Sequence, residues 1–338
     1  MKLSCVGIDL AKNVFQVHGV DEAGKKVVGK QLRRDAMLGY FRQQAPCLIG
    51  MEACGSAHYW ARELSAQGHD VRIMAPQFVK PYVKGNKTDA NDAAAICEAV
   101  SRPSMRFVSI KSVDQQMAQA EHRVRARLVR ARTALSNEIR GLLGELGVII
   151  KPGLCALRQA LPDLLEDADH GVPDRFRRLL AELRDELVSL DERLASHDRH
   201  LQDVARQDER VQRLMAIEGM GVISATALVS AVGDAKQFAD GRAMASWLGI
   251  VPSEHSSGGK QRLGGISKRG STYLRTLMIH GARAALKAAA TKTDRRSEWV
   301  NQLSVRRNRN IATVALANKN VRIAWSILAR GETYRAAA

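Results

Sequence analysis

The first hundred residues alternate short apolar runs with helical patterns, and this order predicts a mixed sheet covered by helices. Three β-type runs come first, separated by turn residues, which is typical of an antiparallel meander. A strand–helix–strand segment and an Ala-rich helix follow. The predicted strands lie at 3–9, 14–20, 26–32, 47–51 and 70–75, and the predicted helices at 35–44, 57–67 and 88–101. We therefore expect an α/β domain over residues 1–110.

Two long helical patterns fill residues 111–210. From Met117 to Leu146 the apolar residues recur at spacings that repeat every eleven residues. From Phe176 to Val204 the spacings alternate between four and three, which is typical of a coiled coil. His197 lies on this seam, and we favour a role in setting its register over a metal or catalytic role. The four–three spacing does not decide whether this apolar seam packs against another helix of the same chain or of a second copy. We expect the seam to drive assembly into a homodimer or tetramer.

Residues 211–335 predict a mostly helical C-terminal domain, so the chain as a whole is α/β plus all-α. Residues 214–232 predict a helix, a Gly-Met-Gly turn and a second helix. This segment resembles the helix-hairpin-helix module, whose turn offers backbone N–H groups to a DNA phosphate. Glu218 stands where that module often has proline, and a helical pair used only for packing is an equal alternative.

The charge distribution points to a polyanionic partner. The formal net charge is +17, and residues 251–338 alone carry +13. These basic residues alternate with Gly and Asn loops instead of lining one amphipathic face, which favours nucleic acid over a membrane surface. No stretch approaches the roughly 20 apolar residues of a membrane span, so we expect a cytoplasmic, nucleoid-associated protein without a membrane partner. The five cysteines include no CxxC pair, which argues against a zinc knuckle.

Four acidic residues of the first domain are candidates for a metal site. Asp9 ends the first predicted strand, and Glu52 follows the apolar strand at 47–51. Asp89 and Asp92 are three residues apart and share one face of the predicted helix. Four converging carboxylates can hold two divalent ions on a phosphodiester, and oxygen ligands suit Mg²⁺. Alternatively, Asp89 and Asp92 only stabilise the N-terminal end of a helix capped by Thr88, through its dipole, and Asp9 is only a turn residue.

The segments GIDLAKNVFQVHGVD, MEACGSAHYWA and KTDANDA, followed by WLGIVPSEHSSGGKQRLGGISKRGSTYLR, resemble the DEDD transposases of the bacterial IS110 family, and most closely its IS1111 subgroup. The resemblance covers nearly the whole chain. It implies a RuvC-like domain of the RNase H type, a coiled-coil middle and a C-terminal transposase domain. On this resemblance Asp9, Glu52, Asp89 and Asp92 form the family's acidic tetrad.

The same resemblance implies a nucleophilic serine, which maps onto Ser257; the adjacent Ser256 leaves this assignment uncertain by one residue. From the residues alone, Ser-Ser-Gly-Gly is a flexible loop, and a linker turn is the ordinary interpretation. Glycines and basic side chains around it favour the approach of a phosphate. We expect nucleic-acid contacts, against an ordinary solvated face as the alternative, from Lys260, Arg262, Lys268, Arg269, Arg275, Arg283, Arg306, Arg307 and Arg309.

The resemblance further implies a recombinase that cuts and rejoins donor and target DNA and is guided by a structured bridge RNA. Two other functions fit the residues: a resolvase-like hydrolytic endonuclease, and a non-enzymatic nucleic-acid binding protein that assembles through its coiled coil. The three differ in product, because a recombinase of this kind leaves protein covalently attached to a DNA end, a nuclease leaves free ends, and a binding protein leaves intact DNA.

Overall fold

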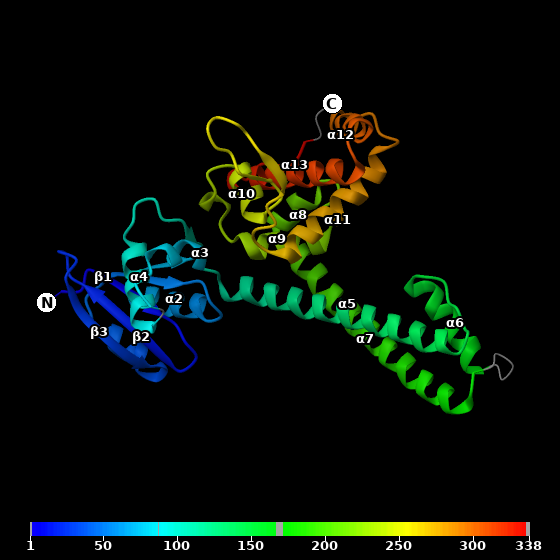
Figure 1. Ribbon diagram of the computed structural model, residues 1–338, viewed down its shortest axis with the longest axis horizontal. Coiled ribbons are helices and arrows are strands. Elements are labelled where there is room, and N and C mark those ends of the chain that lie inside the picture. Colours follow the sequence, from blue (N-terminus) through cyan, green and yellow to red (C-terminus); the bar gives the residue numbers. More distant parts are fainter. Residues whose placement is uncertain (1, 87, 167–171, 336–338) are drawn as a thin grey trace. The chain divides into compact units, whose positions relative to one another are not determined.

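The computed structural model describes residues 2–86, 88–166 and 172–335 (Figure 1). The chain divides into two compact units. The first comprises Met1–Val113 and the short segment Val232–Ala239, and the second comprises Asp114–Ala231 and Asp240–Ala338. Each unit has its own architecture.

A six-stranded mixed sheet forms the centre of the first unit, in the order β3-β2-β1-β4-β5-β6. Strands β1, β4 and β5 run parallel, whereas β2, β3 and β6 are antiparallel to their neighbours. The meander and the strand–helix–strand segment are therefore confirmed. The strands are β1 Cys5–Asp9, β2 Val14–Val20, β3 Lys26–Arg33, β4 Leu48–Glu52, β5 Asp70–Met74 and the unpredicted β6 Phe107–Val108.

Helices cover the sheet with two separate cores. One core joins the sheet to α1 and α2 through residues such as Ile8, Phe15 and Trp60. The other joins it to α4 through Cys5, Met74 and residues of α4 itself. The helical segments are the 3-10 turn η1 Arg34–Ala36, α1 Met37–Arg42, α2 Ala57–Ala66, α3 Pro76–Val79, the 3-10 turn η2 Lys80–Tyr82 and α4 Asp89–Val100.

The second unit contains a long antiparallel helix pair, α5 Val113–Glu145 and α7 Asp174–Gln207. Part of the connection between them is helix α6 Leu154–Glu166, with Pro162 inside, where the Pro and Gly residues suggest a broken linker. The three helices share one apolar core. The part of the α7 seam from Phe176 to Leu194 is thus covered within the chain, whereas Val204 near its end is 38% exposed. Self-association through the seam stays a prediction.

We expect Leu187→Ala to lower the free energy of unfolding by about 2–5 kcal/mol without changing the oligomeric state, because Leu187 is 2% exposed in the α5–α7 core. Urea denaturation and analytical ultracentrifugation measure the two effects. The matched control is the adjacent Val188→Ala, since Val188 is 49% exposed and its loss should cost no more than about 0.5 kcal/mol. A Leu187→Ala protein that dissociates into smaller but equally stable species would instead place the seam between chains.

The rest of the second unit is a helical bundle with one small hairpin. Its elements are α8 Glu209–Met215, α9 Val222–Val232, α10 Gly241–Leu248, β7 Pro252–Glu254, β8 Leu263–Ile266, α11 Thr272–Ala289, α12 Arg295–Arg306 and α13 Arg309–Arg330. The 3-10 turn η4 Ala235–Gln237 belongs to the first unit. Within the described residues, no helix combines the length and apolar character that a bilayer crossing requires.

Candidate functional site

Two of the predicted acidic residues end adjacent parallel strands. Ile8 of β1 pairs with Met51 of β4, so Asp9 and Glu52, the next residue of each strand, lie at the same sheet edge. Side chains alternate between the two faces of a strand. Ile8 and Met51 lie in the core under α1 and α2, whereas Cys5 and Leu48 pack with α4. Alternation therefore places both carboxylates on the face that α4 covers.

Two glycines let helix α4 approach this face closely. A Cβ atom on Gly7 would lie 2.1 Å from the carbonyl oxygen of Ala93, and one on Gly50 would lie 2.7 Å from Cβ of Val100. Gly7 precedes Asp9 by two residues, and Ala93 directly follows Asp92. Side chains at these two strand positions would push α4 away from the strands. The glycines thus bring the start of the helix toward the strand end that carries Asp9.

Thr88 fixes the first turn of α4. Its hydroxyl oxygen accepts a hydrogen bond from the backbone N–H of Asn91 at 3.2 Å, as a helix N-cap does. Asp89 and Asp92 both lie in this first turn, where Asp89 is exposed and Asp92 half-buried. The alternative role of these residues, in complementing the helix dipole, is compatible with a metal role, because the same position serves both.

Asp9 and Glu52 lie on the sheet face that α4 covers, and Asp89 and Asp92 lie in the first turn of that helix, but in the described part of the chain no three of these carboxylates come within ligand distance of one another. The described residues do contain one cluster at ligand distance, but it lies in the second unit. It consists of Glu121, His197 and His200, whose ligand atoms are all within 4.8 Å of one another. The acidic set offers oxygen atoms only, which suits Mg²⁺. Repulsion between carboxylates opposes a tighter cluster unless a cation compensates it.

Ser257 lies in a hairpin, not in a flexible loop. Beyond β7 and β8, His255 N donates to Arg262 O at 3.0 Å and Lys260 N donates to Ser257 O at 3.0 Å. The two turn residues, Gly258 and Gly259, have φ values of 57° and 74°. Positive φ at both central positions is typical of a type I′ hairpin turn and explains why both are glycine. The turn thus presents Ser257 and Lys260 side by side at its base.

The two adjacent serines have different surroundings. The Ser256 hydroxyl donates to Oε1 of Glu254 at 2.6 Å and accepts from the backbone N–H of Arg262 at 3.1 Å. It therefore helps to hold the hairpin together. The Ser257 hydroxyl makes no hydrogen bond to any residue in the described part of the chain. Of the two, Ser257 is the one whose oxygen is not already engaged.

Arg275 is the predicted DNA contact that the structure places inside the protein. It is only 8% exposed, and its guanidinium donates to the carbonyl oxygens of Leu248 and Arg269 and to the Thr272 hydroxyl. Arg275 and Arg283 are eight residues apart on α11, but Arg275 does not share the exposure of Arg283 and instead anchors the chain that leads out of the hairpin. We therefore leave Arg275 out of the proposed nucleic-acid contacts.

The other predicted basic residues are exposed, and some converge. Arg283 of α11 and Arg309 of α13 line one pocket of about 510 Å³ together with His280 and Lys287. This places positive side chains from two distant segments around one hollow, as expected for a phosphate-binding surface. The remaining exposed positions are Lys260, Arg262, Lys268, Arg269, Arg306 and Arg307.

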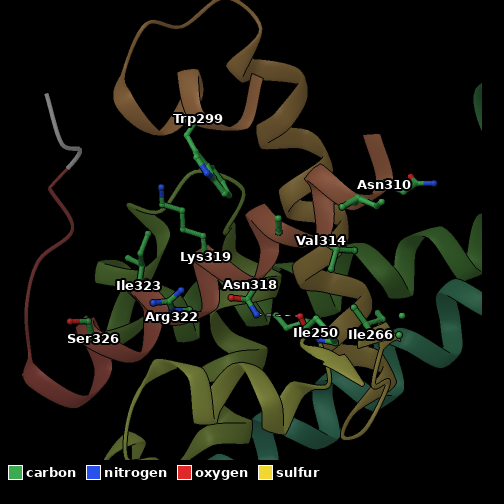
Figure 2. A pocket seen from close by; sticks show the side chains of 15 residues that line it. Ile250, Ile266, Trp299, Asn310, Val314, Asn318, Lys319, Arg322, Ile323 and Ser326 are labelled. Carbon is green, nitrogen blue, oxygen red and sulfur yellow. Dashed lines mark hydrogen bonds between the residues drawn. The ribbon is translucent and has the colours of Figure 1, made fainter. Parts of the chain in front are cut away.

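An apolar groove of about 1100 Å³, which the sequence patterns did not indicate, lies beside the base of the hairpin (Figure 2). Asn318 of α13 donates from Nδ2 to the carbonyl oxygen of Ile250 at 3.2 Å and ties the helix to the hairpin. On the same groove, Lys319 Nζ lies 4.4 Å from the centre of the Trp299 ring. Burial, then the nearby charges of Arg296, Arg295 and Arg322, lower the pKa of Lys319.

The Gly-Met-Gly turn packs against α11. Gly219 has a φ of 85°, and a Cβ atom there would lie 2.3 Å from the carbonyl oxygen of Gly281. The Glu218 carboxylate pairs with Lys292 and with the buried Arg296, whose guanidinium also donates to Asn320 Oδ1 at 2.7 Å. These contacts account for Gly219 and Glu218 in the packing of the domain, and the phosphate contact of the turn stays a prediction.

Two family models match the chain. Residues 6–147 match the model DEDD_Tnp_IS110, described as "Transposase", and residues 211–297 match the model described as "Transposase IS116/IS110/IS902 family". The two matches together define an enzyme of DNA strand transfer.

Curated relatives agree over nearly the full length. The chain is 57% identical to the "Probable family 20 transposase" of Pseudomonas aeruginosa, over 99% of both chains. It is 45% identical to the transposase for insertion sequence element IS1111A of Coxiella burnetii, over 99% of this chain and 92% of that protein. It is also 38% identical to the IS1328 transposase of Yersinia enterocolitica, over 98% of each. The chain therefore belongs to the IS110 family of transposases, and the resemblance is confirmed.

Proposed function

We propose that this transposase recombines DNA through a transient phosphoserine formed on Ser257, with Mg²⁺ held by Asp9, Glu52, Asp89 and Asp92. The observation that carries the metal site is the shared face: Asp9 and Glu52 end adjacent parallel strands on the side where the first turn of α4 lies. This strand order, with helices on both faces, also supports a RuvC-like domain of the RNase H type.

Bound Mg²⁺ would neutralise charge that develops on phosphate oxygens. The protein's own part is positional: β1 and β4 fix Asp9 and Glu52 through their backbone register, and the Thr88 cap fixes the turn with Asp89 and Asp92. Exposed Asp89 has room to change rotamer when a cation binds. Of the four proposed ligands, Asp9 and Glu52 are fixed by the strand register, Asp92 is half-buried in the first turn of α4, and exposed Asp89 is the one with room to move.

In the proposed reaction the Ser257 oxygen forms a bond to phosphorus while the bond to one deoxyribose oxygen breaks. The serine proton leaves to a base, and the released deoxyribose oxygen takes up a proton to become a hydroxyl. Attack by the hydroxyl of a different strand reverses these steps and rejoins the DNA. The unengaged oxygen of Ser257 supports this role, as do the exposed Lys260 and Arg262 beside it, because cations stabilise the phosphate's negative charge.

The covalent intermediate separates this proposal from its two alternatives. Full-length protein is incubated with end-labelled DNA carrying the element's termini, then denatured and run on a gel that resolves protein-bound DNA. We expect labelled DNA that migrates with the protein and is released by protease. Free cleaved ends without an adduct would indicate a hydrolytic nuclease, and intact DNA would indicate a binding protein; either result overturns the phosphoserine.

We also infer that a structured RNA chooses the target. The sequence carries no zinc finger pattern, and the helix-hairpin-helix-like segment at 214–232 would contact the phosphate backbone, which carries no base sequence. The excess of basic residues after residue 250 suits a second polyanion beside DNA. A guide would give specificity by base pairing while the protein contacts backbone and shape.

Co-expression with the DNA that flanks the gene tests this inference. We expect one RNA from the flank to copurify, and substitutions in its pairing loops to redirect recombination to matching DNA. As a control, loops changed to match no target should abolish recombination while RNA binding remains. Recombination of the native sites at full rate by RNase-treated protein would contradict RNA guidance.

A further inference from the structure

We propose that Glu121, His197 and His200 bind one Zn²⁺ ion between helices α5 and α7. His197 Nδ1 lies 2.5 Å from Glu121 Oε1, and His200 Nδ1 lies 3.3 Å from the same oxygen. The three ligand atoms all lie within 4.8 Å of one another. This site lies wholly in the second unit and is separate from the acidic residues proposed to hold Mg²⁺.

Helix geometry explains why these side chains meet. His197 and His200 are three residues apart, so they lie on one face of α7. Their rings are 6.3 Å apart, with the planes at 88°. Glu121 reaches them from the antiparallel α5. The heptad pattern placed His197 on the seam, but nothing in the sequence indicated which residue of α5 faces it.

The donor set favours a transition metal over Mg²⁺. Two imidazole nitrogens and one carboxylate are a common three-ligand set for Zn²⁺, which completes a tetrahedron with a water molecule. Mg²⁺ prefers oxygen ligands in an octahedron. His197 and Glu121 are 21% and 26% exposed, whereas His200 is 63% exposed. The site is therefore anchored on the inside and accessible to an ion from the solvent side.

Neighbouring contacts hold α5 in the position that the site requires. Arg125, one turn after Glu121, pairs with Asp198 at 2.5 Å, so its positive charge is compensated. His122 is buried between the Thr226 hydroxyl at 3.0 Å and the Tyr273 hydroxyl at 3.1 Å. A bound ion would thus clamp α5 to α7 at the end of the pair that contacts α9 and α11.

The test uses full-length protein stripped of metal with a chelator and dialysed. Isothermal calorimetry with Zn²⁺ should show one equivalent bound, and Co²⁺ should give the visible absorption of a four-coordinate ion. Glu121→Gln and His200→Gln should each weaken Zn²⁺ binding by about 100-fold or more. His280→Gln, at an exposed position on α11, is the matched control and should bind as the wild type does.

Two further results distinguish this site from the proposed Mg²⁺ site. Asp92→Ala should leave Zn²⁺ binding unchanged, and Mg²⁺ in large excess should not displace Co²⁺. Wild-type protein that binds no more Zn²⁺ than His200→Gln would overturn the proposal, and the three side chains would then be a hydrogen-bonded group that only sets the register of α5 on α7.

Discussion

Asp9→Ala and Asp92→Ala are each expected to lower DNA strand transfer by at least about 1000-fold, while folding and DNA binding persist. Loss of one ligand removes charge stabilisation of several kcal/mol at the reacting phosphate, and each 1.36 kcal/mol is about tenfold in rate. Both side chains are only half-buried and lie at element ends, so their truncation leaves the strand ladder and α4 intact. Strand transfer on a gel, thermal melting by circular dichroism and a DNA-binding isotherm measure the three properties.

Asp35→Ala provides the control for lost negative charge in the same unit. The Asp35 side chain is 73% exposed and pairs with Arg33 of β3, which β2 separates from Asp9 of β1, so strand transfer should remain at the wild-type rate. Wild-type protein in excess EDTA should behave as the Asp9→Ala variant does. Full strand transfer by either acidic-site variant, or by the wild type in EDTA, contradicts the metal site.

The sheet was predictable because its strands carry strong local patterns. The predicted strand at 14–20 coincides with β2, and the others fall within two residues of the observed limits. Helix α6 was missed because Pro162 and the flanking glycine and proline suggest a linker, although proline is tolerated where packing against α7 compensates. The two-residue β6 has no pattern of its own and exists only because it pairs with Ile73 and Met74.

The candidate site was predictable only to the level of elements. The alternation of side chains along β1 and β4 can be read from the sequence, and it puts Asp9 and Glu52 on the face opposite Ile8 and Met51. That this face meets α4 is known only from the structure. Arg275 could not be assigned this way, since its burial depends on carbonyl groups of distant loops. The contacts of Glu121 with two histidines likewise depend on the register of two helices that are far apart in sequence.

Replacement of the two adjacent serines is expected to give opposite results. Ser257→Ala should eliminate the covalent protein–DNA adduct and all strand transfer, because it removes the hydroxyl oxygen that is proposed to attack phosphorus. Ser256→Ala should retain the adduct at a reduced rate, because it removes the hydrogen bonds to Glu254 and Arg262 that order the hairpin. Adduct formation on labelled DNA, followed by peptide mapping of the modified residue, measures both.

Glu254→Gln tests whether Glu254 only holds the hairpin in shape or also acts as a base that activates Ser256. An amide oxygen still accepts the Ser256 hydrogen bond, so adduct formation should stay within about tenfold of the wild type if Glu254 only orders the hairpin. If Ser256 were the nucleophile and Glu254 its base, Glu254→Gln and Ser256→Ala would both abolish the adduct, and Ser257→Ala would not. That pattern would move the nucleophile by one residue, whereas an adduct that survives Ser256→Ala together with Ser257→Ala would exclude a serine of this hairpin altogether.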